Sequence, residues 1–363
     1  MPRGEFPPMR PKDRVKTAFA HREPDRVPFD YRANAEIDIA LKAHHGLAAD
    51  DAEGLRQKLG VDFRNAWAGY RGPELHHPPE GLRANVWGAT MKWIDHSAGG
   101  YWDYWGWPLE HAGLDEIEAW PMPSKDDFDT EGVGGLCEQW SDSFIVLGGA
   151  GLGDIINQTG MLRTMGQVLI DLYTDDAAGL RLIDRRHEVE LSVLRRCLEA
   201  ADGRADTVMI GEDLGSQRGP LLSMELFRRH IRPRLQKFVD LAREFDLPVM
   251  MHSDGSVDWV YPELMDMGIT AVDAVQIECA GMEPASLKRR FGDKLSFHGV
   301  WPTTGMLAHG TVQQAVDETR HVLASMMEGG GFAMAPAHQL QSNTPLENLL
   351  AALEEIRRVG RYR

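Results

Sequence analysis

Cysteine, positive charge and long apolar runs are all scarce in this sequence. Its three cysteines, Cys137, Cys197 and Cys279, are too few and too widely spaced for a disulfide framework, which fits a protein of the reducing cytoplasm. No apolar stretch approaches the roughly 18 residues of a membrane-spanning helix. Residues 1–8 lack the apolar core of a secretion signal. We therefore expect a cytoplasmic protein without a membrane span.

Acidic residues outnumber basic ones, 55 against 39, and the formal net charge is −16. Such a charge disfavours nucleic acid and anionic lipid as the main partner. With 363 residues the chain could hold one barrel of ordinary size plus roughly a hundred further residues, or two smaller domains. Because there is no tandem repeat and no low-complexity linker, a single domain over residues 1–363 is the simpler expectation. The oligomeric state stays open, a homodimer included.

Short apolar runs that end in polar residues recur through the second half of the sequence. The runs are 207–210, 247–251, 274–277, 295–297 and 331–336. The polar residues that follow them are Glu212, Asp213, His252, Asp254, Glu278, Cys279, His298 and His338. Such runs are typical of strands buried on both faces of a parallel sheet, and the helical segments between them complete βα units. The sequence therefore predicts an α/β fold, a (β/α)₈ TIM-type barrel with its active site at the carboxyl-terminal rim.

Helices are predicted from apolar residues that recur about every 3.6 positions. A short amphipathic helix is expected at 13–22 and is ended by the prolines of 24–28. Ser223 is expected to cap a helix whose apolar face includes Phe227, Ile231 and Leu235. Later helices are expected at 257–267, 284–291, 312–328 and 345–357.

Tryptophan is concentrated in one segment, about residues 60–145, where helical and strand periodicity are weak. Eight of the ten tryptophans lie there. One interpretation is that their rings pack an irregular, insertion-like segment onto the barrel. The other is that part of 101–107 forms the wall of a pocket for a flat ligand, because aromatic rings offer large apolar area with few rotamers to fix. The candidates for that wall are Trp102, Trp105 and Trp107.

Five motifs resemble, in order and spacing, the uroporphyrinogen decarboxylase superfamily. They are Pro24–Pro28, Gly211–Gly215, His252–Gly255, Lys288–Gly292 and His338–Asn348. The resemblance covers residues 11–362 and implies a (β/α)₈ barrel. It also implies one of two activities, because the superfamily contains decarboxylases and zinc-dependent methyltransferases that work with corrinoid proteins.

The decarboxylase branch binds a substrate with eight carboxylates through an N-terminal segment that contains two arginines. In the matching place, 29–34, this chain keeps one arginine, Arg32, and adds Asp30. An octa-anion without arginine partners in an acidic barrel would suffer desolvation and repulsion. Tetrapyrrole decarboxylation is therefore the alternative function. Decarboxylation of a smaller compound would need no metal and would use His338, or an aspartate or glutamate, as proton donor with a cationic clamp from Arg32 or Arg64.

The methyltransferase branch carries a His-x-Cys zinc motif at the position of His252, and a later cysteine. This chain has Asp254 in place of the first cysteine, and its His338 falls near the second. Imidazole and carboxylate are themselves zinc ligands. The candidate metal ligands are His252, Asp254, Glu278, Cys279 and His338.

Zinc held without thiolates is a stronger Lewis acid toward an oxygen ligand. We therefore expect a zinc-dependent enzyme that moves a methyl group from a methoxylated aromatic substrate to the cobalt(I) of a separate corrinoid protein. The catalytic candidates are His338, Glu278, Asp213 and His298, and Arg32 and Gln276 join the three tryptophans as substrate-binding candidates.

A purely structural role is the alternative for each candidate. His252 and Asp254 could hydrogen-bond each other or a turn amide, and Glu278 could pair with Arg289. Cys279 could be a small buried apolar residue.

The remaining candidates have similar alternatives. His298 could fill the barrel mouth as a neutral hydrogen-bonding group. One of Glu212 and Asp213 could orient a histidine or bind a polar substrate group while the other is solvated. A protein that holds a corrinoid or porphyrin without catalysis is the third functional class, but it would leave the titratable groups at the strand ends without a role.

Overall fold

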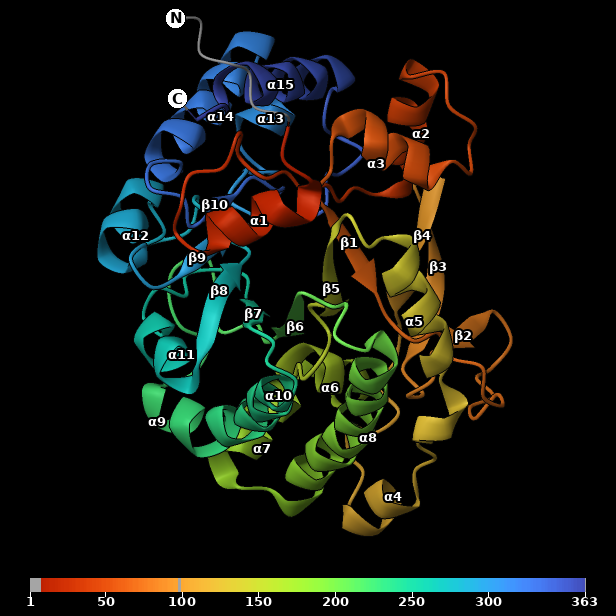
Figure 1. The fold of residues 1–363 in the computed structure, drawn as a ribbon. Helices are drawn as coiled ribbons and strands as arrows, with labels where there is room; N and C mark the ends of the chain where they lie inside the picture. Colours follow the sequence, from red (N-terminus) through yellow and green to blue (C-terminus); the bar gives the residue numbers. More distant parts are fainter. Residues whose placement is uncertain (1–7, 97–98, 363) are drawn as a thin grey trace, which may run out of the picture.

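The computed structural model, which describes residues 8–96 and 99–362, is organised around a curled parallel sheet of seven strands (Figure 1). The strands follow one another in the order β1-β5-β6-β7-β8-β9-β10, and every neighbouring pair is parallel. Their bounds are β1 Phe63–Ala66, β5 Phe144–Gly148, β6 Thr207–Gly211, β7 Val249–His252, β8 Ile269–Asp273, β9 Ser296–His298 and β10 Phe332–Ala333. Because all seven run the same way, their carboxyl ends share one rim.

An extended segment around Phe29 lies between the two outer strands of the sheet. Phe29 forms a parallel bridge with Met334, just after β10, and its carbonyl accepts the Asp62 N–H, just before β1. Ala33 forms a second parallel bridge, to Leu340. The sheet is therefore consistent with a TIM-type barrel in which seven strands are regular and the Phe29 segment occupies the gap between the outer two.

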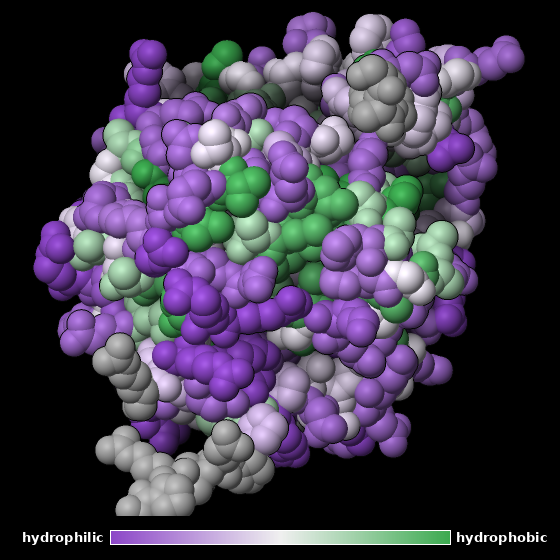
Figure 2. All heavy atoms as spheres, turned by 90° about the horizontal axis from the view of Figure 1, so that it is seen from above, coloured by the Kyte–Doolittle hydropathy of each residue, from purple (hydrophilic) through white to green (hydrophobic). Residues whose placement is uncertain are grey.

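Helices surround the sheet (Figure 1). Those of the first half are α1 Pro11–Phe19, α2 Ala35–His44, α3 Ala52–Leu59, α4 Leu114–Ala119, η1 Lys125–Asp127, α5 Thr130–Gln139, α6 Ile156–Arg163, α7 Met165–Thr174 and α8 Ala177–Ala201. Those of the second half are α9 Met224–Leu226, η2 Phe227–Ile231, α10 Arg232–Glu244, α11 Tyr261–Met267, α12 Pro284–Phe291, α13 Met306–His309, α14 Val312–Met326 and α15 Leu346–Val359. None in the described part of the chain is long and apolar enough to cross a membrane. The face in Figure 2 is mostly hydrophilic, with a hydrophobic strip across its middle.

Helix α1 covers the amino-terminal end of the sheet. Its Val15 and Phe19 pack against inward-facing strand residues, among them Phe63, Met209 and Met250. The Ala18 carbonyl accepts the Gly331 N–H immediately before β10. Apolar side chains therefore fill the barrel interior at this end of the sheet.

The predicted helices are confirmed at most positions, with shifted ends. The 13–22 helix is α1 at 11–19, the 257–267 helix starts later as α11, and the 284–291 helix is confirmed as α12. Ser223 caps its helix by accepting the Leu226 N–H. After α9 the helix passes through the π-helical turn η2 before it continues as α10, and the 3.6-residue periodicity did not predict this turn.

The strand predicted at 274–277 is wrong. The strand at this position is β8, Ile269–Asp273, and residues 274–277 follow it. An apolar-run criterion misses β8 because the strand carries an exposed Thr270 and ends in a buried carboxylate.

The tryptophan-rich segment contains regular structure where none was expected. Strands β2 Leu82–Ala84, β3 Thr90–His96 and β4 Gly99–Tyr104 form an antiparallel sheet. Trp102 of β4 packs edge-on against Trp93 of β3, with ring centroids 5.7 Å apart. The guanidinium of Arg83 lies 4.2 Å from the Trp102 ring.

Candidate active site

Polar side chains stand at the carboxyl ends of four adjacent strands. Asp213 follows β6, His252 ends β7, Asp273 ends β8 and His298 ends β9. His338 comes shortly after β10. Parallel strands place these residues on one rim, and small inward residues such as Ala271 and Ala333 lie below them in the barrel interior.

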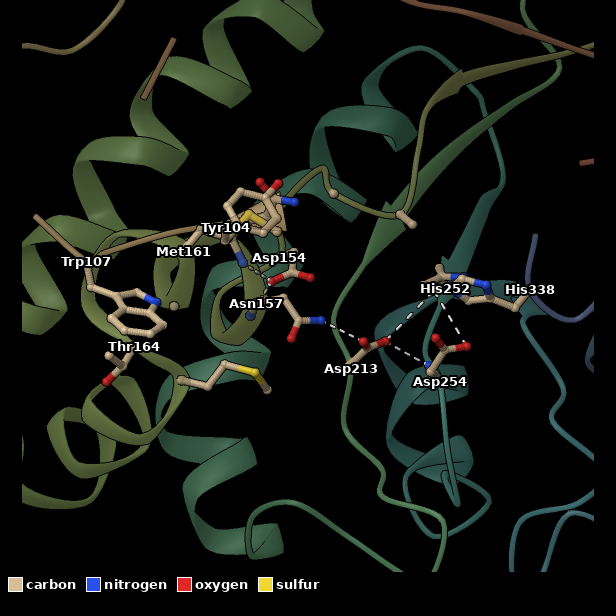
Figure 3. Close-up of a pocket in the computed structure, with 15 residues that line it drawn as sticks. Tyr104, Trp107, Asp154, Asn157, Met161, Thr164, Asp213, His252, Asp254 and His338 are labelled. Carbon is tan, nitrogen blue, oxygen red and sulfur yellow. Dashed lines mark hydrogen bonds and ion pairs between the residues drawn. The ribbon is translucent and has the colours of Figure 1, made fainter. Parts of the chain in front are cut away.

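A cavity of about 550 Å³, here called the rim cavity, opens at this rim (Figure 3). One side carries Asp213, His252, Asp254 and His338. The other side is more apolar and carries Tyr104, Trp107, Met161 and Thr164. The remaining lining residues are Ala150, Gly151, Asp154, Asn157, Gln158, Gly160 and Met165. A volume of this size suits a small organic molecule.

Asp213, His252 and Asp254 form a group, the carboxylate–imidazole triad, with ligand atoms all within 4.8 Å of one another. His252 Nε2 lies 3.9 Å from Oδ1 of Asp213 and 3.9 Å from Oδ1 of Asp254. One imidazole nitrogen and two carboxylate oxygens are a ligand set suited to a divalent metal, and zinc accepts it.

Asp273 fixes the orientation of His252. Oδ2 of Asp273 lies 2.6 Å from Nδ1 of His252, so Nε2 is left to face the rim cavity. A carboxylate behind a histidine is the arrangement that orients metal-ligating imidazoles. Burial on its own would lower the pKa of His252, but the hydrogen bond and charge of Asp273, with the charge of Asp254, raise it.

The two carboxylates of the triad are held close together. Asp213 accepts the backbone N–H of Asp254 at 2.8 Å and the side-chain amide of Asn157 at 2.6 Å. Oδ1 of Asp254 is buried and has no hydrogen-bond partner among the described residues. Burial raises the pKa of Asp254, and the neighbouring charge of Asp213 raises it further. A cation at this position would relieve both effects, so the residues fit a bound metal.

Asp273 also connects the rim to the N-terminal segment. Its Oδ1 lies 2.6 Å from Nδ1 of His298, and both of its oxygens accept hydrogen bonds from the Arg32 guanidinium. Asp30 Oδ2 lies 3.3 Å from Nε2 of His298. Burial would raise the pKa of Asp273, but Arg32, His298 and His252 together hold it well below its usual range. The charge of Arg32 is therefore already compensated inside the protein.

Two further acids, Glu212 and Asp154, lie close enough to Asp213 to interact with its charge. Glu212 is buried and accepts the backbone N–H groups of Ile155 and Ile156 at the start of α6, so it is not solvated and does not line the rim cavity. Asp154 accepts the backbone N–H of Asn157 and lines the cavity. Burial raises the pKa of Asp154 to about 6, and it raises the pKa of Glu212 well above its usual range.

Comparison with known proteins decides the family. Residues 137–359, more than half of the chain, match uroporphyrinogen decarboxylase (URO-D). The chain belongs to the uroporphyrinogen decarboxylase family. This confirms the resemblance seen in the sequence motifs. No curated protein matches the chain by sequence.

The fold is shared with a solved methyltransferase from Methanosarcina mazei. The two chains superpose with a TM-score of 0.65 at 18% sequence identity, over 96% of this chain and 99% of the other. Two further structures match far less well. They are the IOLI protein with a bound zinc atom (TM-score 0.33, 12% identity, 69% of this chain and 91% of that one) and an endo-1,4-beta-xylanase from Penicillium canescens (0.34, 12%, 63% and 78%).

The structure brings some of the predicted ligands of this family member together and leaves others apart. Asp213, His252 and Asp254 form the triad, and His338 is exposed in the cavity wall beside His252 (Figure 3). Glu278 lies outside this group, because β8 ends five residues before it. Its exposed carboxylate accepts a hydrogen bond from Thr304 at 2.8 Å.

Cys279 and Gln276 also lie outside the triad. Cys279 is buried, its Sγ is 3.7 Å from Oε1 of Gln276, and burial raises the pKa of its thiol. The same Gln276 oxygen accepts the Gly255 N–H at 2.8 Å, which holds the turn after β7. Both residues support the loop that carries Asp254 and do not line the rim cavity.

Of the aromatic and arginine candidates, only one lines the rim cavity. Trp107 lines the rim cavity together with Tyr104, whereas Trp102 and Trp105 do not. Arg32 pairs with Asp273, and Arg64 pairs with Glu53 at 2.8 Å. No arginine or lysine is among the described residues that line the rim cavity.

Sequence reasoning missed Asp273, the residue that orients His252 and His298. It obeys the same rule as the others, since it is a polar residue at the end of a strand. It was overlooked because the strand itself was placed at 274–277. Asn157 and Met161 were also missed, because nothing in the local sequence of α6 distinguishes residues that face a cavity from residues that face solvent.

Proposed function

We propose that the protein is a metal-dependent methyltransferase that takes a methyl group from a methoxylated aromatic compound and transfers it to a separate corrinoid protein. The observation that carries the proposal is the composition of the rim cavity, where the triad faces an apolar wall with Tyr104 and Trp107. The methyltransferase fold of the Methanosarcina mazei protein supports the same class of reaction.

His252, Asp213 and Asp254 would hold the metal, with zinc the ion that this ligand set favours. When bound, the metal supplies a Lewis acid for the ether oxygen of the substrate. The protein contributes the orientation of His252 through Asp273, and the negative charge of two carboxylates.

The apolar wall would bind the aromatic ring of the substrate. Tyr104 and Trp107 offer flat apolar faces, and Met161 offers a flexible thioether that packs well against a ring. In this pose the methoxy group points across the cavity toward the triad. The methyl–oxygen bond breaks, the methyl group passes to the cobalt(I) of the corrinoid protein, and the oxygen keeps the bonding electrons.

His338 would supply the proton that this oxygen takes up. It is exposed in the cavity wall, beside His252, and so can exchange protons with solvent. Proton transfer from a positioned imidazole typically contributes a factor of about 10² to 10⁴ in rate.

Tetrapyrrole decarboxylation, the other activity of the family, is less well supported by the cavity. A substrate with many carboxylates needs cationic partners. Arg32 is already paired with Asp273. The described residues that line the rim cavity include three aspartates, Asp154, Asp213 and Asp254, but no lysine or arginine.

The experiment incubates the purified protein with a methoxylated phenol and a reduced corrinoid protein. The expected result is loss of the cobalt(I) absorption and growth of the methyl-cobalt(III) spectrum, together with ~one zinc per chain by metal analysis. The control omits the methoxylated compound. Release of carbon dioxide from a porphyrinogen, with no methyl transfer to any corrinoid tested, would replace the proposal by the decarboxylase alternative.

A further inference from the structure

A second cavity, of about 410 Å³, lies next to the rim cavity and is here called the Trp67 cavity. It is enclosed by the carboxyl ends of β1 and β5, by α8 and by the tryptophan-rich segment. Its lining residues are Asn65, Trp67, Val86, Trp87, Phe128, Gly148, Gly149, Gly151, Leu152, Gln158, Val189, Glu190 and Val193. None of the triad residues is among them.

Three aromatic side chains form much of the wall of this cavity. Trp67, Trp87 and Phe128 all come from the tryptophan-rich segment, are half-buried and line the cavity, and the guanidinium of Arg186 lies 5.2 Å from the Trp87 ring. Val189 and Val193 of α8 contribute further apolar surface. Walls of this kind favour a flat apolar ligand, and the volume lies within the range of small-molecule sites.

The polar groups of the Trp67 cavity carry little net charge. Glu190 is buried, and its carboxylate is 2.7 Å from Nη2 of Arg186 and accepts the Gly153 N–H at 3.0 Å. Because both oxygens of Glu190 already have partners inside the protein, it offers no free acceptor to a cation, and no lysine or arginine among the described lining residues is present to bind an anion. Asn65 and Gln158 add neutral amide groups at the wall. The ligand that fits is therefore uncharged and has at least one hydrogen-bonding group.

A thin partition separates the two cavities. Gly151 and Gln158 line both of them. A Cβ added at Gly151 would lie 3.0 Å from Nε2 of Gln158, so the backbone and this amide are in close contact. The Trp67 cavity is thus a neighbour of the rim cavity with its own walls.

We propose that the Trp67 cavity is a second small-molecule site, which binds an uncharged, single-ring aromatic compound with a hydroxyl or amide group. Nothing in this site depends on a metal or on methyl transfer, so it goes beyond the proposed function. Its ligand has the chemistry of a phenol.

The test uses 4-fluorophenol as a probe, which is uncharged at neutral pH, and measures its binding by titration calorimetry and ¹⁹F NMR. Val189→Phe and Val193→Phe each place a ring in the Trp67 cavity and should weaken binding at least tenfold. Leu191→Phe is the matched control, because Leu191 is on the same helix and does not line the cavity. Circular dichroism checks the fold. If the variant at the buried Val193 does not fold, the variant at the half-buried Val189 tests whether the probe binds in the Trp67 cavity.

Two further variants separate this site from the rim cavity. Met161→Trp narrows the rim cavity at its apolar wall and should leave probe binding intact, and so should His252→Ala, which removes a triad residue. These results would stand even if no methyl transfer were found. Binding that survives Val189→Phe but is lost in Met161→Trp would place the phenol in the rim cavity and overturn the proposal, as would the absence of binding at millimolar probe.

Discussion

His252 Nδ1 and Asp273 Oδ2 lie 2.6 Å apart, although the two residues end different strands. Their register places them directly opposite each other in the pairing of β7 with β8. The pair is therefore built by the sheet itself, and its geometry does not depend on a loop. This explains how a histidine at the rim can hold one nitrogen toward the cavity before any ligand binds.

The first prediction concerns this pair. Asp273→Asn should weaken zinc binding by about 10- to 100-fold, because an amide no longer fixes the imidazole as a carboxylate does. The protein should also lose stability, since Arg32 and His298 lose their shared partner. Competition with a chelator measures the affinity. Asp30→Asn is the control, because Asp30 contacts His298 and not His252. Equal zinc affinity in both variants would reject an orienting role.

The second prediction concerns the ligands of the triad. His252→Ala should weaken metal binding by an order of magnitude or more while the fold survives, whereas His321→Ala, an exposed histidine on α14, should have no effect. Asp254→Cys should increase cadmium affinity, because a thiolate is a softer ligand than a carboxylate. Unchanged cadmium affinity would remove Asp254 from the site.

The third prediction concerns pH. Burial raises the pKa of Glu190 to about 7, against an ordinary value of 4.5. The folded state therefore binds the proton of the Glu190 carboxyl more tightly than the unfolded state does. The stability that Glu190 contributes is complete below pH 4.5 and is lost as the pH rises through 7. Relative to Glu190→Gln, the wild-type unfolding free energy should fall by about 1–3 kcal/mol across this window. Urea titrations measure it.

Glu188→Gln is the control for this pH effect, because Glu188 is an exposed residue of the same helix, and its Arg181 partner is also near the surface. A wild-type curve parallel to that of Glu190→Gln would show that Glu190 titrates normally in the folded protein.

The fourth prediction concerns His338. In the methyl-transfer assay, His338→Ala should lower the rate by roughly 10²-fold or more, because it removes the proton donor. Zinc content should stay at the wild-type level, since His338 lies outside the triad. Loss of zinc together with activity would make His338 a metal ligand, and a wild-type rate would leave it without a catalytic role.

The sequence predicted the barrel-like sheet and much of its rim, because burial on both faces leaves a strong local signal of short apolar runs that end in polar residues. This rule found Asp213, His252, His298 and His338. It failed at β8, where an exposed Thr270 and a terminal aspartate weakened the apolar run. The misplaced strand then made Glu278 and Cys279 candidates and hid Asp273.

The cavity walls were harder to predict for a different reason. Whether Trp107 or Trp105 faces the rim cavity depends on how β4 and the following turn sit against α6, and local sequence does not encode such packing. The pairing of Arg32 with Asp273 joins residues far apart in the chain. Contacts of this range follow from the closed sheet and have no signature in either segment.

The bridges that join Phe29 to Met334, Ala33 to Leu340 and Arg26 to Arg361 have a consequence for biosynthesis. During translation the segment at 26–33 leaves the ribosome long before the residues that it pairs with, and it must wait for them in an unpaired state. Arg32 and Asp30 reach Asp273 and His298 only from that segment. The wall that carries the carboxylate–imidazole triad is thus completed near the end of synthesis, and a nascent chain stalled before Met334 would carry His252 without its anchored surroundings.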